Sequence, residues 1–335
     1  MTNETDNASD GGRLDGMQIQ AENIAFKADE MIACAKCGKA NPPNRASCLY
    51  CATPIELPEE RRLEAKLNLR PLENWEKGFN IVFMPSADDR DTAGMASYLS
   101  IDRGVLREML SATRPFPIAR IESEAEAVIA VQQLGKFGLL ATIVGDEILQ
   151  ADKLPIRLRG IEFRDSSIVV TAFNTGEKTE IGSEDVRMVV AGSVIESKRE
   201  SVEKRKKKGT KLLQEIETAS DEKLLDFYCG SDMIGFRVPT KGFDFSCLGA
   251  EKGLLAAENM DRLLERLFKF SPTAKMIEEY GAVANVLSTV WELDRRKDFQ
   301  GLTRTGIGRA GFGNVVWTSN LTQFTKDSRL QRHLL

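Results

Sequence analysis

Residues 31–55 read MIACAKCGKANPPNRASCLYCATPI and contain four of the six cysteines in this chain of 335 residues. Cys34 and Cys37 form one Cys-x-x-Cys turn, and Cys48 and Cys51 form a second after ten intervening residues. Each turn brings two thiolates to one metal ion, so two turns complete a tetrahedral sulfur shell. A segment this short buries too little apolar surface to fold alone, so the metal supplies its folding energy. The four cysteines are therefore predicted to be the ligands of one structural metal ion.

The text around these cysteines resembles a bacterial short zinc-ribbon domain, with Cys-x-x-Cys-Gly, then Asn-Pro-Pro, then a second Cys-x-x-Cys. Gly38 fits the left-handed position after the first turn, whereas Ala52 stands where the second turn often has glycine. The resemblance implies a zinc ribbon over residues 31–56 that binds one structural Zn²⁺. An iron site of the rubredoxin type uses the same ligands, but its longer spacing and aromatic cluster are missing here. Disulfides are disfavoured in a reducing compartment.

Composition argues against several kinds of catalysis. The chain has 46 Lys+Arg, 50 Asp+Glu and a single histidine, and its net charge is −4. That histidine, His333, is the third residue from the end, where chain termini fray. Ser-His-Asp, Cys-His and multi-histidine metal chemistry are thus disfavoured. Cys229 and Cys247 lie in apolar contexts predicted to be strands, and we expect both to pack in a core. We therefore expect that the protein is not an enzyme.

The ends of the chain and its charge bear on location and partners. Residues 1–30 carry seven acidic and two basic side chains, without the basic start and apolar core of a signal peptide. No apolar run reaches the length needed to span a bilayer. We expect a soluble cytoplasmic protein with a disordered acidic leader over 1–30 and a linker over 57–78. The negative net charge gives no overall reason to expect nucleic acid or an anionic membrane as a partner.

Residues 79–150 are predicted to form a small α/β unit in the order strand, helix, helix, strand, helix, strand. FNIVFMP (79–85) and PIARI (117–121) read as strands, and SEAEAVIAVQQLGKFGLLATIV (123–144) as a helix followed by a strand. This pattern resembles the α/β sandwich shared by the C-terminal domain of the ribosomal stalk protein and the ClpS adaptor. Both families bind protein partners through this unit, so the resemblance implies docking and not catalysis.

Residues 154–270 change to a period of two, which is typical of antiparallel strands. The segment AAENMDRLLERLFKF (256–270) is amphipathic at helical spacing. Together they resemble a pleckstrin-homology-like barrel with a capping helix, interrupted by a basic insertion over 198–223 that we expect to be a solvated loop and a short helix. The predicted fold class is therefore α+β and multidomain, with a zinc ribbon, a small α/β sandwich and an antiparallel pleckstrin-homology-like β-barrel.

The densest positive run is Arg205-Lys206-Lys207-Lys208. Like charges repel, so a solvated loop is the simplest interpretation; contact with phosphates or with an anionic membrane surface is the alternative. Beyond a predicted helix over 271–294, residues 295–335 are glycine-containing and basic, and we expect a C-terminal arm that is flexible or ordered by a partner. Gly306–Gly313 contains a formal G-x-G-x-x-G, but without the strand before it and the helix after it that a nucleotide loop needs.

These observations favour a non-catalytic zinc-ribbon adaptor that acts as a subunit or scaffold in a protein assembly. One alternative is a nucleic-acid-associated regulator that uses the basic insertion and the C-terminal arm. A second alternative is an accessory subunit of an enzyme complex.

Overall fold

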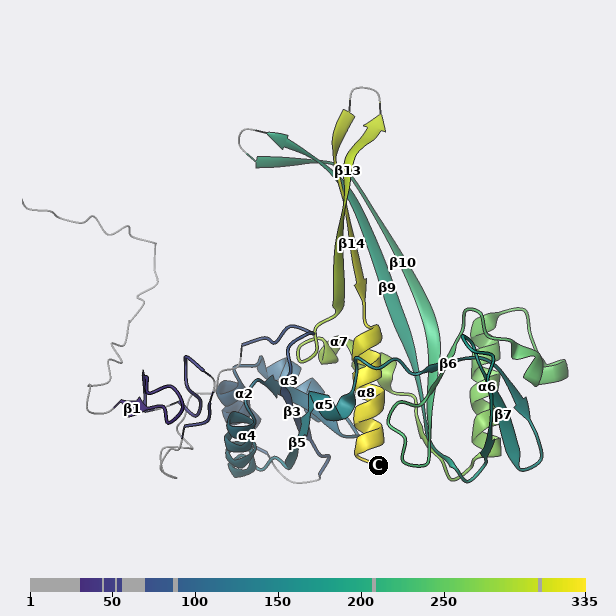
Figure 1. Ribbon diagram of the computed structural model, residues 1–335, viewed down its shortest axis with the longest axis horizontal. Coiled ribbons are helices and arrows are strands. Elements are labelled where there is room, and N and C mark those ends of the chain that lie inside the picture. The colour runs from purple at the N-terminus through teal and green to yellow at the C-terminus, as the bar shows by residue number, and fades with distance from the viewer. Residues whose placement is uncertain are drawn as a thin grey trace, which may run out of the picture.

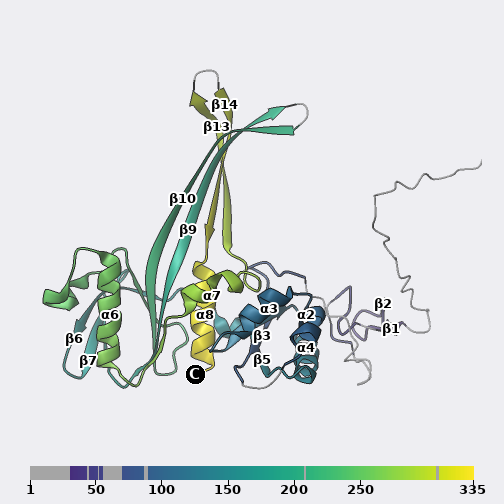
Figure 2. The ribbon, with the colours of Figure 1, turned by 180° about the vertical axis from the view of Figure 1, so that it is seen from behind.

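The computed structural model describes residues 31–43, 45–51, 53–55, 70–86, 90–206, 209–306 and 309–335. In these residues the chain is a mixed α/β protein built mostly from sheet (Figure 1). A cysteine module lies at one end, an α/β unit follows, and a curled sheet forms the other end. A long β-sheet projection stands clear of them all (Figure 2). The predicted leader over 1–30, and most of the predicted linker, lie outside the described residues.

The cysteine module covers residues 31–55 and has little regular structure of its own. Strands β1 (Ile32–Ala33) and β2 (Ala40–Asn41) pair in antiparallel fashion around the first Cys-x-x-Cys turn. A bridge between Ser47 and Pro54 closes the second turn. The module is thus two short hairpin-like loops, each of which presents two cysteines.

The α/β unit has the element order that the sequence predicts. Its elements are β3 (Phe79–Phe83), α2 (Thr92–Leu99), α3 (Arg103–Leu110), β4 (Phe116–Ile121), α4 (Glu124–Lys136), β5 (Ala141–Gly145) and the short α5 (Asp146–Leu149). The three strands form one sheet in the order β4-β3-β5, and both pairings are antiparallel. All six residues of β4 are buried, because helices cover one side of this sheet and C-terminal elements cover the other.

The second sheet is larger and is curled into a half-barrel. Its strands are β6 (Ile156–Phe163), β7 (Ser167–Ala172), β8 (Lys178–Gly182), β9 (Val186–Lys206), β10 (Gly209–Cys229), β11 (Phe236–Pro239), β12 (Lys275–Ile277), β13 (Asp294–Gly306) and β14 (Arg309–Ser319). They follow the order β13-β14-β9-β10-β11-β6-β7-β8, with β12 beside β9. The 3-10 helix η2 (Phe245–Glu251) and helix α6 (Ala256–Phe270) lie against it. The helix predicted over 256–270 is confirmed, because Met260, Leu263 and Leu267 bury its apolar stripe.

The distal parts of four strands leave the body as a ribbon, which we call the projection: residues 194–206 of β9, 209–222 of β10, 294–306 of β13 and 309–319 of β14 (Figures 1 and 2). The loop and short helix predicted over 198–223 are therefore wrong, since residues 198–206 and 209–223 form paired strands. Opposite charges across the two strands explain the difference. Arg199 on β9 lies 3.4 Å from Glu215 and 3.5 Å from Glu217 on β10.

Two further predictions in the C-terminal third need correction. The helix expected over 271–294 is confirmed only for α7 (Tyr280–Leu287), because residues 275–277 form strand β12 and pair in parallel with β9. The basic arm expected over 295–335 is the β13–β14 hairpin followed by helix α8 (Leu321–His333). The arm is ordered by the rest of its own chain, which local sequence patterns do not reveal.

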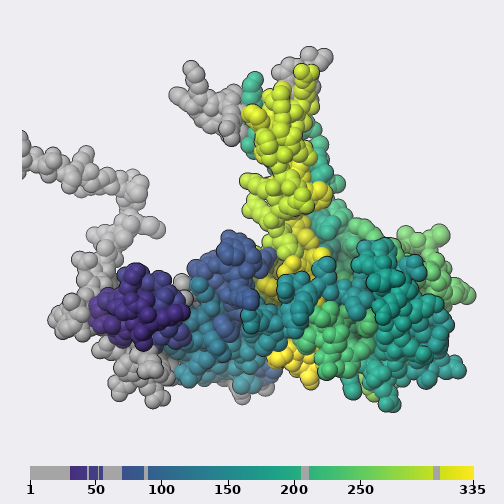
Figure 3. Space-filling model, viewed as in Figure 1, coloured from purple at the N-terminus to yellow at the C-terminus, as the bar shows by residue number. Residues whose placement is uncertain are grey.

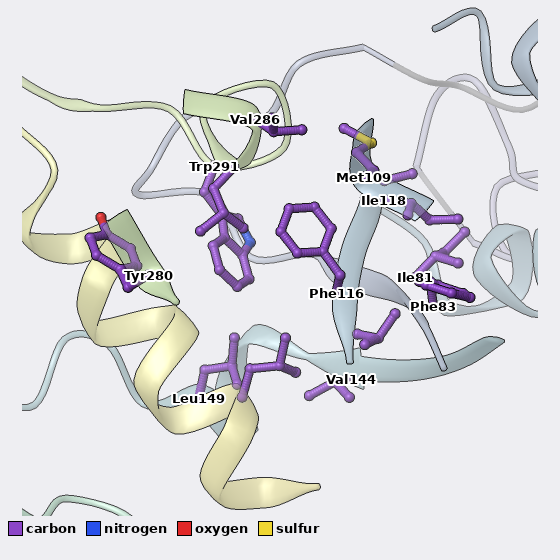
Figure 4. Close-up of a cluster of buried hydrophobic side chains, with 14 of the residues drawn as sticks. Ile81, Phe83, Met109, Phe116, Ile118, Val144, Leu149, Tyr280, Val286 and Trp291 are labelled. Carbon is purple, nitrogen blue, oxygen red and sulfur yellow. The ribbon is translucent and has the colours of Figure 1, made fainter. Parts of the chain in front are cut away.

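Helix α8 occupies the centre of the molecule, between the α/β unit and the curled sheet (Figure 1). Nine consecutive residues from Gln323 to Gln331 are buried although most are polar. Their partners come from both sides: Asp327 binds Arg114 beyond α3, and Ser328 contacts the hydroxyl of Tyr228 on β10 at 2.7 Å. Figure 4 shows that the apolar core is shared in the same way, since the ring of Phe116 on β4 points towards Trp291.

Candidate metal centre

The four predicted ligands come together. One sulfur atom from each of Cys34, Cys37, Cys48 and Cys51 lies within 4.8 Å of all the others. The Sγ atoms of Cys34 and Cys51 are 3.6 Å apart, and those of Cys37 and Cys48 are 3.5 Å apart. A tetrahedral ion with Zn–S bonds of about 2.3 Å needs sulfur atoms about 3.8 Å apart. The predicted cluster is thus confirmed, and its four thiols can hold one metal ion.

Backbone hydrogen bonds hold both Cys-x-x-Cys turns in shape. In the first turn, the amide of Gly38 donates to the carbonyl of Cys34 at 2.8 Å. Gly38 has φ of +70°, so the left-handed position predicted for it is confirmed. In the second turn, the amide of Cys48 donates to the carbonyl of Thr53 at 2.9 Å. These hydrogen bonds help to set the directions in which the four thiols point.

Two N–H groups donate hydrogen bonds to the sulfur of Cys48. The side-chain amide of Asn41, which is fully buried, and the backbone amide of Tyr50 each lie 3.4 Å from Cys48 Sγ. Burial raises the pKa of the Cys48 thiol, but hydrogen bonds from the amides of Tyr50 and Cys51 outweigh it and lower the pKa to about 6. Hydrogen bonds from Thr53 lower the pKa of Cys51 as well. Thiolates, the form that binds metal, are stabilised at these two positions.

The cysteine module is attached to helix α4 of the α/β unit. Ile129 of α4 belongs to the same buried cluster as Cys34, Cys48 and Ile55. Nearby, the hydroxyl of Ser47 donates to the buried carboxylate of Glu126 at 2.8 Å. The space-filling view shows the module resting against the α/β unit (Figure 3). The metal centre is therefore part of a joint between two parts of the chain.

A groove of about 690 Å³ runs along this joint. Its walls are the second Cys-x-x-Cys turn and the N-terminal turns of α4. Exposed apolar side chains of Leu49, Tyr50 and Val128 line it, together with the exposed carboxylates of Glu122 and Glu124. Local sequence reasoning did not find this groove, although the pair Leu49-Tyr50 between the two cysteines offers a signal, since a ribbon turn has no core in which to bury them.

The other predicted basic site lies far from the cysteines, at the end of the projection (Figure 1). Arg205 and Lys206 are the last paired residues of β9, facing Thr210 and Gly209. Lys207 and Lys208 lie outside the described residues. Anion binding by these four residues stays a prediction.

The glycine run is also part of a β-hairpin. Strand β13 ends at Gly306 and strand β14 begins at Arg309, and the two strands pair throughout. A strand therefore follows the glycines where a nucleotide loop has a helix. This arrangement agrees with the interpretation that the run is not a nucleotide-binding loop.

The two remaining cysteines are partly buried beside the core of the curled sheet. Cys229 ends strand β10 as predicted, but Cys247 lies in the 3-10 helix η2, so the strand predicted there is wrong. Burial raises the pKa of Cys229 to about 12 and also raises the pKa of Cys247. Both side chains therefore stay as thiols at neutral pH, which suits a packing role.

Comparison with protein-family models, with curated proteins and with solved structures gives no match for this chain. Among the helices in the described part of the chain, none combines the length and the apolar character that crossing a membrane requires.

Proposed function

We propose that this chain is a non-catalytic adaptor whose cysteine module holds one structural zinc ion and binds a protein partner in the groove beside α4. Four thiolates fill a tetrahedral shell and leave no open coordination position, which supports a structural role for the metal. The all-sulfur donor set and the sulfur spacing of 3.5 and 3.6 Å fit a tetrahedral zinc ion. The short separation of ten residues between the two turns favours zinc over an iron site of the rubredoxin type. The structural role of the metal is then to keep the second Cys-x-x-Cys turn in place, because this turn forms one wall of the groove beside α4.

The groove between the module and α4 is the observation that carries the adaptor function. Its apolar surface is exposed: Leu49, Tyr50 and Val128 are 53%, 59% and 42% accessible. Contiguous apolar surface with a polar rim is typical of sites that bind other proteins. The exposed carboxylate of Glu124 at the rim favours a basic segment, whereas the carboxylate of Glu122 is already paired with Arg70 at 3.0 Å. The partner chemistry that fits is a peptide segment with an apolar anchor flanked by lysine or arginine.

Binding of synthetic peptides to the full-length, metal-loaded protein tests this site. The probes are peptides with one leucine or phenylalanine flanked by lysines, and matched peptides in which glutamates replace the lysines. We expect Leu49→Asp and Val128→Asp to weaken binding of the basic peptides about tenfold, which corresponds to about 1.4 kcal/mol. Leu254→Asp is the matched control, because Leu254 is fully exposed and lies outside the groove. Equal binding of basic and acidic peptides, or equal loss in the control, contradicts the proposal.

Metal analysis of the purified protein tests the zinc assignment. One zinc per chain is expected, and iron in its place would overturn the assignment. The Cys34→Ser variant should lose the metal, whereas Cys229→Ser should retain it, because Cys229 lies outside the cluster.

A nucleic-acid-associated function is the second candidate, and the projection is the observation that favours it. The basic run that includes Arg205 and Lys206 lies at the outermost end of β9, where a long polymer can reach it. Phosphate contacts of this kind weaken steeply as salt is raised. Retention on a DNA or RNA column at low salt, lost on replacing residues 205–208 with serine, supports this candidate, and no retention at low salt rejects it.

A further inference from the structure

The projection is a four-stranded ribbon whose two outer strands have open edges. Its order is β13-β14-β9-β10. Within the described residues, β13 pairs only with β14, and β10 pairs only with β9 over residues 209–222. Strands in globular proteins typically have about 5–6 residues, and long open edges are rare because they invite pairing with another chain. Two edges of this length therefore call for an explanation.

The two edges carry opposite charge. Over its whole length β13 has four basic side chains and two acidic ones, and one of the acidic ones, Asp294 at the base, accepts a hydrogen bond from the amide of Thr322 at 3.0 Å. Between Lys211 and Glu222, β10 has four acidic side chains and one basic one. Charges of mixed sign would be enough to keep edges apart in solution. A basic edge and an acidic edge on one ribbon are instead complementary to each other.

The strand directions also match. Each neighbouring pair in the ribbon is antiparallel, so β13 and β10 run in opposite directions. A second copy whose β10 lies beside β13 of the first would run antiparallel to that strand, and the twist of the sheet, about 20–25° per strand, would turn its body away from the body of the first copy. The alternation of strand directions would then continue without interruption from one copy to the next.

The pairing register places complementary side chains at the same level on the two outer edges of the ribbon. One row across the ribbon runs from Lys297 on β13, through Val316 and Arg199, to Glu217 on β10. Another row runs from Leu302 on β13 to Leu212 on β10. Leu302 and Leu212 are 71% and 48% exposed. Two copies paired in this register would bring Lys297 next to Glu217, which already lies 3.5 Å from Arg199 in its own chain, and would bring two leucines together at the second level.

We propose that copies of this chain associate side by side through their projections, with β13 of one copy paired to β10 of the next. The two surfaces differ, so the contact is heterologous and generates a closed ring or an open filament. Backbone hydrogen bonds between the two strands would stabilise this contact, as in strand addition to an open sheet edge. The complementary charges of the two edges would add to it. The partner is a second copy of the chain, because this ribbon itself supplies both matching edges.

Size measurement of the full-length protein over a range of concentrations tests the association. We expect species larger than the monomer of 37.2 kDa at low salt and their loss in the Lys297→Glu variant. Lys178→Glu is the matched control, because Lys178 is an exposed lysine on β8 at the opposite end of the same sheet. A protein that stays monomeric at every concentration and low salt overturns the proposal, as does equal loss in the control variant.

Cysteine cross-linking tests the arrangement independently of charge. The variant with Leu302→Cys and Leu212→Cys should give a ladder of covalent multimers on mild oxidation of the zinc-loaded protein. Its two new thiols cannot pair within one chain, because three strand spacings, about 14 Å, separate them. Each single variant should give no ladder beyond the wild-type background. Covalent dimers from either single variant alone indicate a twofold contact and contradict the proposal.

Discussion

The guanidinium of Arg114 donates two hydrogen bonds to the carboxylate of Asp327, at 2.7 and 3.0 Å, although 213 residues separate the two in sequence. The two side chains are only 6% and 0% exposed. The pair joins the segment after α3 to the middle of α8, and so ties the α/β unit to the C-terminal helix. Asp327, a charged residue of α8, is therefore buried together with its partner.

Removing one member of this pair should destabilise the fold strongly. Arg114→Ala leaves the Asp327 carboxylate buried and unpaired, so we expect a loss of about 3–5 kcal/mol in the free energy of unfolding. Urea denaturation followed by circular dichroism measures it. Lys77→Ala, which breaks an exposed ion pair with Glu147, should cost far less, because solvent screens this pair. The double variant Arg114→Met/Asp327→Leu should recover most of the stability, and a loss as large as that of Arg114→Ala would contradict this account.

A second buried cation gives the fold a pH dependence. Lys326 of α8 is 3% exposed, and within the described residues its Nζ has no hydrogen-bond partner. Burial lowers the pKa of Lys326 from 10.5 to about 8, although nearby Asp146 and Asp294 partly oppose the change. Between these two values the unfolded chain binds more protons than the folded one. The free energy of unfolding should therefore rise with pH in this window, by up to about 3 kcal/mol.

Comparing the wild type with Lys326→Met between pH 7.5 and pH 9.5 isolates this contribution. The variant should lose the rise that Lys326 causes and should be the more stable protein at pH 7.5. Lys275→Met removes an exposed lysine and should keep the rise. Identical pH profiles for the wild type and Lys326→Met would show that Lys326 is not the source.

Removal of the metal should unfold only the cysteine module. Its buried cluster is small and includes two of the four sulfurs, Cys34 and Cys48, so the module depends on the ion for its stability. Hydrogen exchange with a strong chelator should show faster exchange at residues 31–55 and at the face of α4 around Ile129. Exchange in β9 and α8 should not change. Amide protection of the module that survives chelation would argue against a structural metal.

One glycine marks where the sheet and α8 touch. A Cβ added to Gly192 on β9 would lie 2.6 Å from Cε2 of Phe324 and 2.8 Å from Cδ1 of Tyr280. We expect Gly192→Ala to cost about 1–3 kcal/mol by overpacking, measured by thermal unfolding. Gly160→Ala is the matched control, because among the described residues a Cβ there meets no atom within 4 Å. Equal stability of the two variants would contradict the close contact of Gly192 with Phe324 and Tyr280.

Local signals predicted those parts of the fold that local interactions determine. The stripe from Met260 to Leu267 defined α6, since apolar spacing alone shows which face is buried. The two Cys-x-x-Cys turns likewise defined the metal cluster, because short loops and one ion are enough to bring four sulfurs together.

The remainder depends on partners far away in sequence. Helix α8 has few apolar residues, and its burial follows from Arg114, Tyr228 and Arg237, which no window around residue 327 contains. In the sequence, the strands of the projection resemble a charged loop. Only the fold shows that Glu215 and Glu217 lie opposite Arg199. The groove beside α4 forms only when the module meets the helix.

The connection between the projection and α8 makes the projection a lever. Strand β14 ends at Ser319 and α8 begins at Leu321, so a single residue, Asn320, joins them. The side chain of Asn320 also accepts a hydrogen bond from the amide of Ile195 on β9 at 2.8 Å, which leaves the joint little freedom to bend. Eleven residues of β14 extend about 36 Å at 3.3 Å per residue. A sideways force at the far end is therefore converted into torque on α8, which contacts both the α/β unit and the curled sheet.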